Sequence, residues 1–367
     1  MDSHMEQPVS RGGKSELIPE VLKAFFARAR NIVGSEETYR AILVHQLRNV
    51  GIHCDDIVAE YPTGSGRIDL AILSRDQPGE SIAHLIEIKG GAYGNRHALH
   101  DELKAGLEKK DLKKLKETGD VNTKRWFIAL DLSSIKGPID LEARSWAASE
   151  CTRRGINFVY YDFSASEAQI ISSGRQLVLS VEDQPTNYRM DPEAASVMDS
   201  DLFWEKSSKA CQSKVLHEQN MVLRIYEALM SHRLPDYAVS LETQFQFAKG
   251  RSKNGKNRPD ICIFDPTING KFNLYAQGRI AQSRDALKLS KLQRLIEVKV
   301  APTIGDALDD IKKLAGWRAQ MQSRANDLGV EMHDQVGFMF VAAHVDSRIQ
   351  PEIIDYARDL GISTRIL

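Results

Sequence analysis

Two short patterns each occur twice in this chain, and their repeated order constrains the fold more than any other feature. The first copy has Arg-Ile-Asp at 67–69 and Leu-Ile-Glu-Ile-Lys at 85–89, and the second has Arg-Pro-Asp at 258–260 and Leu-Ile-Glu-Val-Lys at 295–299. Glu and Lys alternate with branched apolar residues, which is the period of a strand with one buried face. Each copy therefore predicts two strands that bring an Asp, a Glu and a Lys together.

The surrounding segments correspond as well. A helix candidate precedes each pair of strands, one with Ser35 as a good N-cap and one near Glu218, and the sequences Asp-Leu-Lys-Lys-Leu (111–115) and Asp-Ile-Lys-Lys-Leu (310–314) follow. A buried-strand candidate, an amphipathic helix and a Gly-Ile step into a short strand complete each half. This shared order predicts an internal duplication.

The duplication also predicts the domain boundaries. We expect a first domain at 16–165 and a second at 202–367. The intervening residues 166–201 are rich in Ser, Gln, Asp and Pro, so we expect a linker with a short strand near 176–181. Residues 1–15 are expected to be a tag or a disordered terminus, since the polar start resembles a cloning remnant.

Composition agrees with two globular domains. The 367 residues are 42% hydrophobic and 27% charged, and the net charge of −1 does not exclude a local basic groove for nucleic acid. No signal peptide is recognised, and no apolar run approaches the roughly 18 residues of a membrane span. The cysteines form no Cys-x-x-Cys pair, so we expect buried thiols in a reducing cytoplasm and no zinc site or disulfide. They are Cys54, Cys151, Cys211 and Cys262.

Taken together, these patterns resemble the PD-(D/E)xK superfamily, whose members have the restriction-endonuclease-like fold, once in each half. Ile68 replaces the Pro of the family's name, which is a common variation. The resemblance implies an α/β protein with two tandem domains, each a mixed central sheet flanked by helices. It also implies hydrolysis of phosphodiester bonds in DNA with Mg²⁺ or Mn²⁺ as the cofactor.

The resemblance assigns a catalytic set to each half: Asp69, Glu87 and Lys89, and Asp260, Glu297 and Lys299. The carboxylates would hold the metal, and each Lys would orient or deprotonate the attacking water. A Glu of the first helix often joins the metal ligands in this family. Aligning the apolar residues of the two helices pairs Glu36 with Glu218, whereas a shift by one residue favours Glu37.

These residue types suit the chemistry. Mg²⁺ takes oxygen ligands and retains several waters, so two or three carboxylates suffice. A bound metal neutralises charge on the phosphate and lowers the pKa of its water. An ammonium beside it supplies a positive charge to the developing negative oxygen.

Several basic residues are candidates for contacts with the nucleic-acid backbone. The candidates are Arg96, Lys113, Lys253, Lys256, Arg258 and Lys312. Arg96 follows the first Glu-Lys strand in a Gly-rich loop, and the basic loop 249–258 precedes Asp260. Lys113 and Lys312 recur at one place in the duplication. The alternative is structural: a plain strand-to-helix connection, a disordered hairpin tip and a solvated helix face.

The two copies differ in spacing. Asp69 and Glu87 are 18 residues apart, whereas Asp260 and Glu297 are 37 apart. The additional segment, 265–293, carries several cations that could read the substrate or block it: Lys271, Arg279, Arg284, Lys288 and Lys291. The compact first site is therefore favoured as the catalytic one.

The leading hypothesis is a metal-dependent endonuclease with two nuclease domains, acting on DNA in defence against foreign DNA. Accessory defence proteins are expected partners and a membrane is not, and no feature indicates a particular oligomeric state. One alternative is a nickase with a single active domain. Another is an inactive nucleic-acid-binding or assembly subunit. For the Asp and Glu-x-Lys motif itself, the structural alternative is a set of cross-strand ion pairs on a solvated face.

Overall fold

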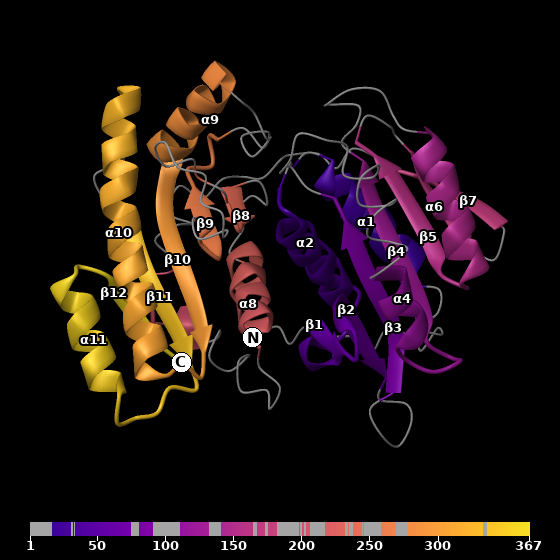
Figure 1. Cartoon of the computed structure of the whole chain (residues 1–367), viewed down its shortest axis with the longest axis horizontal. Coiled ribbons are helices and arrows are strands. Elements are labelled where there is room, and N and C mark those ends of the chain that lie inside the picture. Colours follow the sequence, from indigo (N-terminus) through magenta and orange to yellow (C-terminus); the bar gives the residue numbers. More distant parts are fainter. Residues whose placement is uncertain are drawn as a thin grey trace, which may run out of the picture.

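The computed structural model describes most of the chain and contains two mixed sheets with helices on both faces (Figure 1). The described residues are 17–30, 32, 34–74, 81–90, 111–131, 141–163, 167–172, 175–181, 198, 200–201, 203–205, 217–231, 234, 238–243, 245, 258–268, 278–332 and 336–367. The α/β class predicted from the sequence is confirmed.

The first sheet has seven strands in sequence order. They are β1 (Ile57–Thr63), β2 (Gly66–Ser74), β3 (Ser81–Lys89), β4 (Lys124–Asp131), β5 (Asn157–Asp162), β6 (Glu167–Ser172) and β7 (Arg175–Ser180). Strands β3, β4 and β5 run parallel, and the other neighbouring pairs are antiparallel. Helices α1 (Leu17–Ala29) and α2 (Glu36–Asn49) cover one face, and α4 (Leu112–Glu117) and α6 (Leu141–Arg153) cover the other.

The second sheet repeats the first five strands in order and direction. Its strands are β8 (Val239–Leu241), β9 (Ile261–Phe264), β10 (Leu292–Val300), β11 (Gly337–Ala343) and β12 (Ser363–Ile366). Here β10, β11 and β12 run parallel, and β8 and β9 are antiparallel to their neighbours. Helix α8 (Glu218–Ser231) covers one face, and α10 (Ile304–Leu328) and α11 (Gln350–Asp359) cover the other, with α9 (Gly278–Lys291) beside α10.

The two halves meet through α2 and α8, which lie between the sheets (Figure 1). One apolar core runs through both halves here. The contact is reciprocal, because the third residue of each helix bonds the backbone of the opposite sheet. Leu241 N–H donates to Thr38 Oγ1 (3.2 Å), and Ala59 N–H donates to Asn220 Oδ1 (2.8 Å). Such reciprocity is the signature of a two-fold interface, here formed within one chain.

The start of α2 is fixed by its cap. Ser35 Oγ accepts the N–H of Thr38 at 3.2 Å and donates to the carbonyl of Leu241 at 2.7 Å. The N-cap predicted from the sequence therefore also ties α2 to the second half, which sets the position of Glu36 at the first turn of the helix.

The predicted linker needs correction. Strand β6 lies inside it, and β6 and β7 form a hairpin that extends the first sheet. The predicted lone strand at 176–181 is therefore one arm of this hairpin. The buried residues Ala168 and Ile170 alternate with more exposed neighbours, and this two-residue period outweighs the polar composition.

Several expectations fall on residues that the structure does not describe: the terminus 1–15, Cys211, and the loop residues Arg96, Lys253 and Lys256. Cys151 and Cys262 are buried free thiols as expected, whereas Cys54 is partly exposed. None of the helices in the described part of the chain has the length and apolarity required to cross a bilayer.

Candidate functional site

In each half, an Asp occupies the same position relative to the neighbouring Glu-x-Lys strand. Ile88 N–H donates to Asp69 Oδ2, and Val298 N–H donates to Asp260 Oδ2, each at 2.7 Å. Each Asp therefore bonds the backbone amide that lies between Glu and Lys in the next strand.

The Lys of each Glu-x-Lys strand reaches the first helix of its own half. Lys89 Nζ lies 3.2 Å from Glu36 Oε1, and Lys299 Nζ lies 2.9 Å from Glu218 Oε2. Glu37 lies instead beside Arg40, at 3.7 Å. Glu36 and Glu218 are therefore the equivalent helix residues that join Asp, Glu and Lys.

A second Asp and Lys join each of these groups, and the sequence did not identify them as site residues. The first cluster consists of Glu36, Asp69, Glu87, Lys89, Asp111 and Lys114, and the second cluster of Glu218, Asp260, Glu297, Lys299, Asp310 and Lys313. In the first half, Lys114 Nζ lies 3.2 Å from Glu87 Oε1 and 2.7 Å from Asp111 Oδ1, while Lys89 lies 3.3 Å from Asp111.

The second half repeats these contacts. Lys313 Nζ bonds Glu297 Oε1 and lies 3.7 Å from Asp310 Oδ1, while Lys299 lies 3.5 Å from Asp310. The repeated Asp-x-x-Lys spacing, i to i+3 on a helix, was the available signal.

The structure does not bring the neighbouring lysines, Lys113 and Lys312, into the clusters. The side chain of Lys113 is 55% exposed and lies 3.9 Å from Glu117, while Lys312 is exposed on α10. Their predicted contact with phosphate therefore remains a prediction about an exposed helix face.

A further Glu lies opposite each Asp in the strand register. Glu60 and Glu242 both have a left-handed backbone, with φ of 52° and 47°. Glu60 Oε2 accepts from Arg67 at 3.2 Å, and Arg258 lies 3.6 Å from Glu242 Oε2. Non-glycine residues with this backbone are strained and concentrate at functional sites.

Burial and mutual repulsion disfavour charge on the carboxylates. Burial, together with the nearby Asp69, raises the pKa of Glu87 to about 8, and burial raises that of Glu297 to about 7. Burial and then Glu297 raise the pKa of Asp260 well above its ordinary value. For Lys89, burial lowers the pKa, but Glu36, Glu87 and other carboxylates outweigh it and raise the value. Each cluster thus disfavours full ionisation of its carboxylates, and a cation bound nearby would favour the ionised form.

The donor set fits a hard divalent cation. Each half offers strand carboxylates and a helix Glu as oxygen donors, although among the described residues no three of these oxygen atoms lie within 4.8 Å of one another. Of these carboxylates, Glu297 is only 3% exposed. Its Oε2 is buried and has no hydrogen-bond partner among the described residues. A buried carboxylate oxygen without a donor is costly, and a bound cation would satisfy it.

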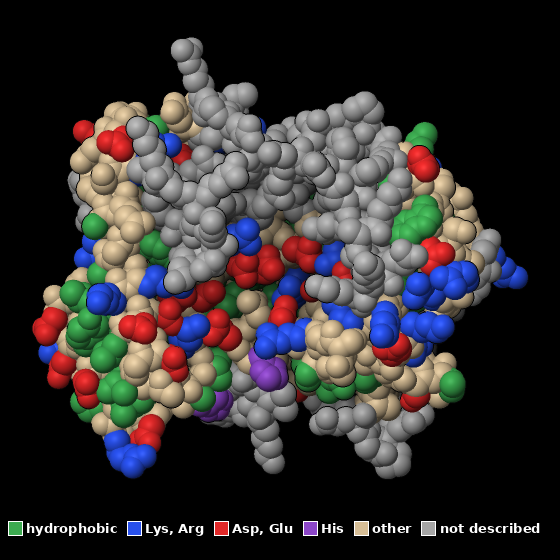
Figure 2. All heavy atoms as spheres, viewed as in Figure 1, with side chains coloured by type: hydrophobic (Ala, Val, Ile, Leu, Met, Phe, Trp, Pro, Cys, Tyr) green, Lys and Arg blue, Asp and Glu red, His purple; other side chains and the backbone are tan. Residues whose placement is uncertain are grey.

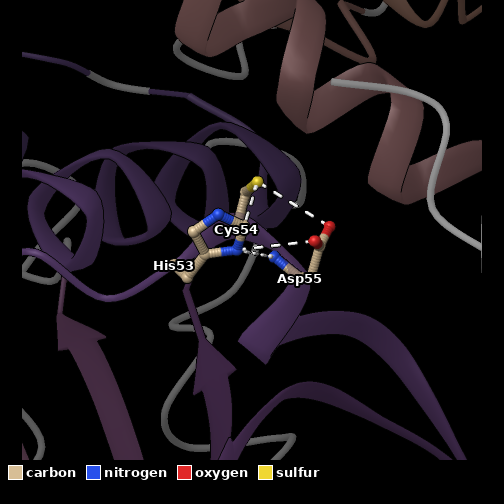
Figure 3. Close-up of side chains that lie close together, drawn as sticks. All are labelled: His53, Cys54 and Asp55. Carbon is tan, nitrogen blue, oxygen red and sulfur yellow. Dashed lines mark hydrogen bonds and ion pairs between the residues drawn. The ribbon is translucent and has the colours of Figure 1, made fainter. Parts of the chain in front are cut away.

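Among the described residues, the three side chains whose metal-ligating atoms all lie within 4.8 Å of one another are His53, Cys54 and Asp55 (Figure 3). These consecutive residues form the start of a 3₁₀ turn (Cys54–Asp56), in which Asp55 N–H donates to His53 Nδ1 at 3.3 Å. Asp55 Oδ1 also accepts from Arg224 at 3.0 Å. The turn and the ion pair account for this cluster without a metal.

Two of the basic residues in the additional segment of the second half, 265–293, form contacts within the protein. Lys288 is buried, lies 3.0 Å from Asp285 and sits 5.2 Å above the ring of Phe245. Lys291 Nζ donates to Thr267 at 2.9 Å. These two cations serve packing of the insertion, and contact with a substrate is not needed to explain them.

Acidic side chains gather across the middle of the molecule where the halves meet, with Lys and Arg beside them (Figure 2). Comparisons of the chain with protein-family models, curated proteins and solved structures found no match. Any inference about the chemistry of this region therefore comes from its residues and their contacts.

Proposed function

We propose that this chain is a metal-dependent endonuclease that hydrolyses phosphodiester bonds in DNA through two tandem restriction-endonuclease-like domains. One observation carries the proposal: both halves hold the same Asp, Glu, Lys and helix Glu in the same contacts. Ion pairs on a solvated strand face do not explain this, because Glu87 and Glu297 are 2% and 3% exposed. Cytoplasmic defence against foreign DNA remains the proposed setting, by analogy with the family.

The carboxylates would hold Mg²⁺ or Mn²⁺, which when bound neutralises the scissile phosphate and acidifies a water. The protein residues supply orientation. Asp69 and Asp260 are fixed by backbone amides, so their carboxylates are held in place before substrate arrives. Lys89 lies between Glu36 and Glu87, and Lys299 lies between Glu218 and Asp310, where an ammonium can donate to a phosphate or water oxygen.

Arginines at the rim offer contacts with the DNA backbone. Arg67 is 69% exposed and Arg258 is 36% exposed, each beside a strained Glu of its own half. A guanidinium binds phosphate through paired donors. We propose that Arg258 and its counterpart Arg67 grip the strand that enters each site.

Supercoiled plasmid tests the proposal. Wild type incubated with Mg²⁺ is expected to give nicked and linear DNA, and EDTA is expected to abolish both. The double variant Asp69→Asn/Asp260→Asn is expected to be inactive, whereas Asp309→Asn, on the exposed face of α10, should cut like wild type. Cutting that persists in the double variant, or wild type inert toward DNA and RNA, would contradict it.

A nickase with one active domain is the second candidate. The observation that favours it is a buried Arg40 beside Asp69, where the equivalent position of α8 is Val222. In a nickase, one single Asp→Asn variant would lose all cutting and the other none.

A further inference from the structure

The two clusters differ at one helix position. Arg40 is the fifth residue of α2, and the fifth residue of α8 is Val222. Both side chains are buried, with Arg40 3% and Val222 2% exposed. The first cluster therefore contains a fixed positive charge that an apolar side chain replaces in the second.

Arg40 is bound directly to the first cluster. Its NH2 group donates to Asp69 Oδ1 at 3.2 Å, and its NH1 group donates to Glu60 Oε1 at 3.1 Å. Ion pairs between buried partners are screened little by solvent. The guanidinium thus neutralises the carboxylate expected to bind a cation.

All four strand carboxylate oxygens of the first cluster have donors. Asp69 Oδ1 accepts from Arg40, and its Oδ2 accepts from the amide of Ile88. Glu87 Oε1 accepts from Lys114, and its Oε2 accepts from the amide of Asp69 at 3.3 Å. This cluster satisfies itself with protein groups.

The second cluster leaves one buried carboxylate oxygen without a donor among the described residues. Lys313 bonds Glu297 Oε1, but Glu297 Oε2 is buried without a hydrogen-bond partner among the described residues. A cation entering here gains a buried oxygen that nothing else occupies. In the first cluster it must compete with a guanidinium and approach an additional positive charge.

We propose that the second cluster is the high-affinity divalent-cation site and that Arg40 is a positioning residue that weakens cation binding at the first. The inference rests on the proposed function and deepens it by ranking the two sites. It reverses the preference for the first site that spacing alone suggested. We expect the second cluster to bind a divalent cation about tenfold or more tightly than the first.

Titration with Mn²⁺, followed by the electron paramagnetic resonance signal of the free ion, tests the ranking without requiring activity. Wild type should show one tight site per chain. Asp260→Asn should remove it and Asp69→Asn should retain it. Arg40→Met should add a second tight site, while Arg40→Lys, which keeps the charge, should behave like wild type. Arg48→Met, on the last turn of the same helix, is the matched control.

Circular dichroism establishes whether Arg40→Met is folded, and the two Asp variants decide the ranking if it is not. Two equal sites in wild type, or loss of the tight site in Asp69→Asn but not in Asp260→Asn, would overturn the ranking. So would a folded Arg40→Met with an unchanged number of sites. Absence of Mn²⁺ binding in every variant would instead overturn the proposed function, and the ranking with it.

Discussion

At the scale of single residues, helix phase decides which lysine joins each cluster. The side chain of Lys114 is 11% exposed and contacts Glu87, whereas that of Lys113 is 55% exposed. Successive helix residues point about 100° apart, so one position separates a buried contact from an exposed one. The sequence indicated the recurrence of the Lys-Lys pair, but choosing its inner member required the packing of Leu112 and Leu115 against the sheet.

Alanine substitution of the inner lysines tests this assignment. Lys114→Ala/Lys313→Ala is expected to lower the rate of Mg²⁺-dependent cleavage by about 10²-fold, because each removes a donor to the buried Glu. The double variant Lys113→Ala/Lys312→Ala is the matched control and should retain the cleavage rate. If it weakens DNA binding in a salt-dependent way, the predicted phosphate contact is supported. A larger rate loss in the control than in the inner pair would contradict the assignment.

Gly90 illustrates a residue whose role the sequence did not reveal. A Cβ at this position would lie 2.6 Å from Leu130 Cβ, which is closer than packed atoms tolerate. The Gly-rich run after Lys89 suggested a loop for DNA, yet its first residue is needed for close approach of β3 to β4.

Gly90→Ala is therefore expected to destabilise the protein by about 1–3 kcal/mol in urea unfolding, through overpacking. Gly316→Ala provides the contrast, because nothing lies within 4 Å of a Cβ there and the residue is inside α10. It should stabilise the protein by about 0.5–1 kcal/mol. Equal effects of the two substitutions on the free energy of unfolding would show that close contact with Leu130 does not destabilise Gly90→Ala.

At the scale of helices and strands, the spacing of apolar residues predicted secondary structure better than amino-acid composition did. The Glu-Lys strands and the helix capped by Ser35 were identified from periodicity and capping, and β3, β10 and α2 occupy those segments. The hairpin β6–β7 was predicted only in part, as one short strand at 176–181, because Ser, Gln, Asp and Pro are frequent over residues 166–201 and indicated a linker. The contact between α2 and α8 was not predicted, since both helices are apolar on faces that could equally pack on their own sheets.

The α2–α8 interface gives a pH-dependent prediction through Glu227. Its Oε2 lies 3.5 Å from Arg48 Nε, and burial, only partly offset by Arg48 and Arg224, raises its pKa to about 7. The folded state then binds this proton more tightly than the unfolded state. The stability that the proton contributes is present below about pH 4.5 and is lost as the pH rises to about 7.

Glu227→Gln should therefore become more stable relative to wild type as the pH rises through this window. The difference in the free energy of unfolding should grow by up to about 3 kcal/mol. Urea unfolding at pH 4.5, 6 and 8 measures it. A Glu227→Gln difference that is flat with pH would mean that the interface does not disfavour the charged carboxylate.

At the scale of the whole molecule, the chain is arranged as two similar halves about a pseudo-two-fold contact. Thr38 and Asn220 make equivalent bonds across it, and the two clusters lie on the sheets that these bonds join. The duplication and the central Asp, Glu and Lys of each cluster could be predicted because identical short patterns mark them. The asymmetry could not, because Arg40 and Val222 both read as ordinary helix residues until burial and contacts distinguish them.

The most direct test of the central claim is the position of bound metal. Crystals soaked in MnCl₂ should give an anomalous difference peak between Asp260 and Glu297 in wild type. In Arg40→Met, an additional peak should lie between Asp69 and Glu87. A map with no peak at either pair of carboxylates, or with manganese only at His53, Cys54 and Asp55, would contradict the account.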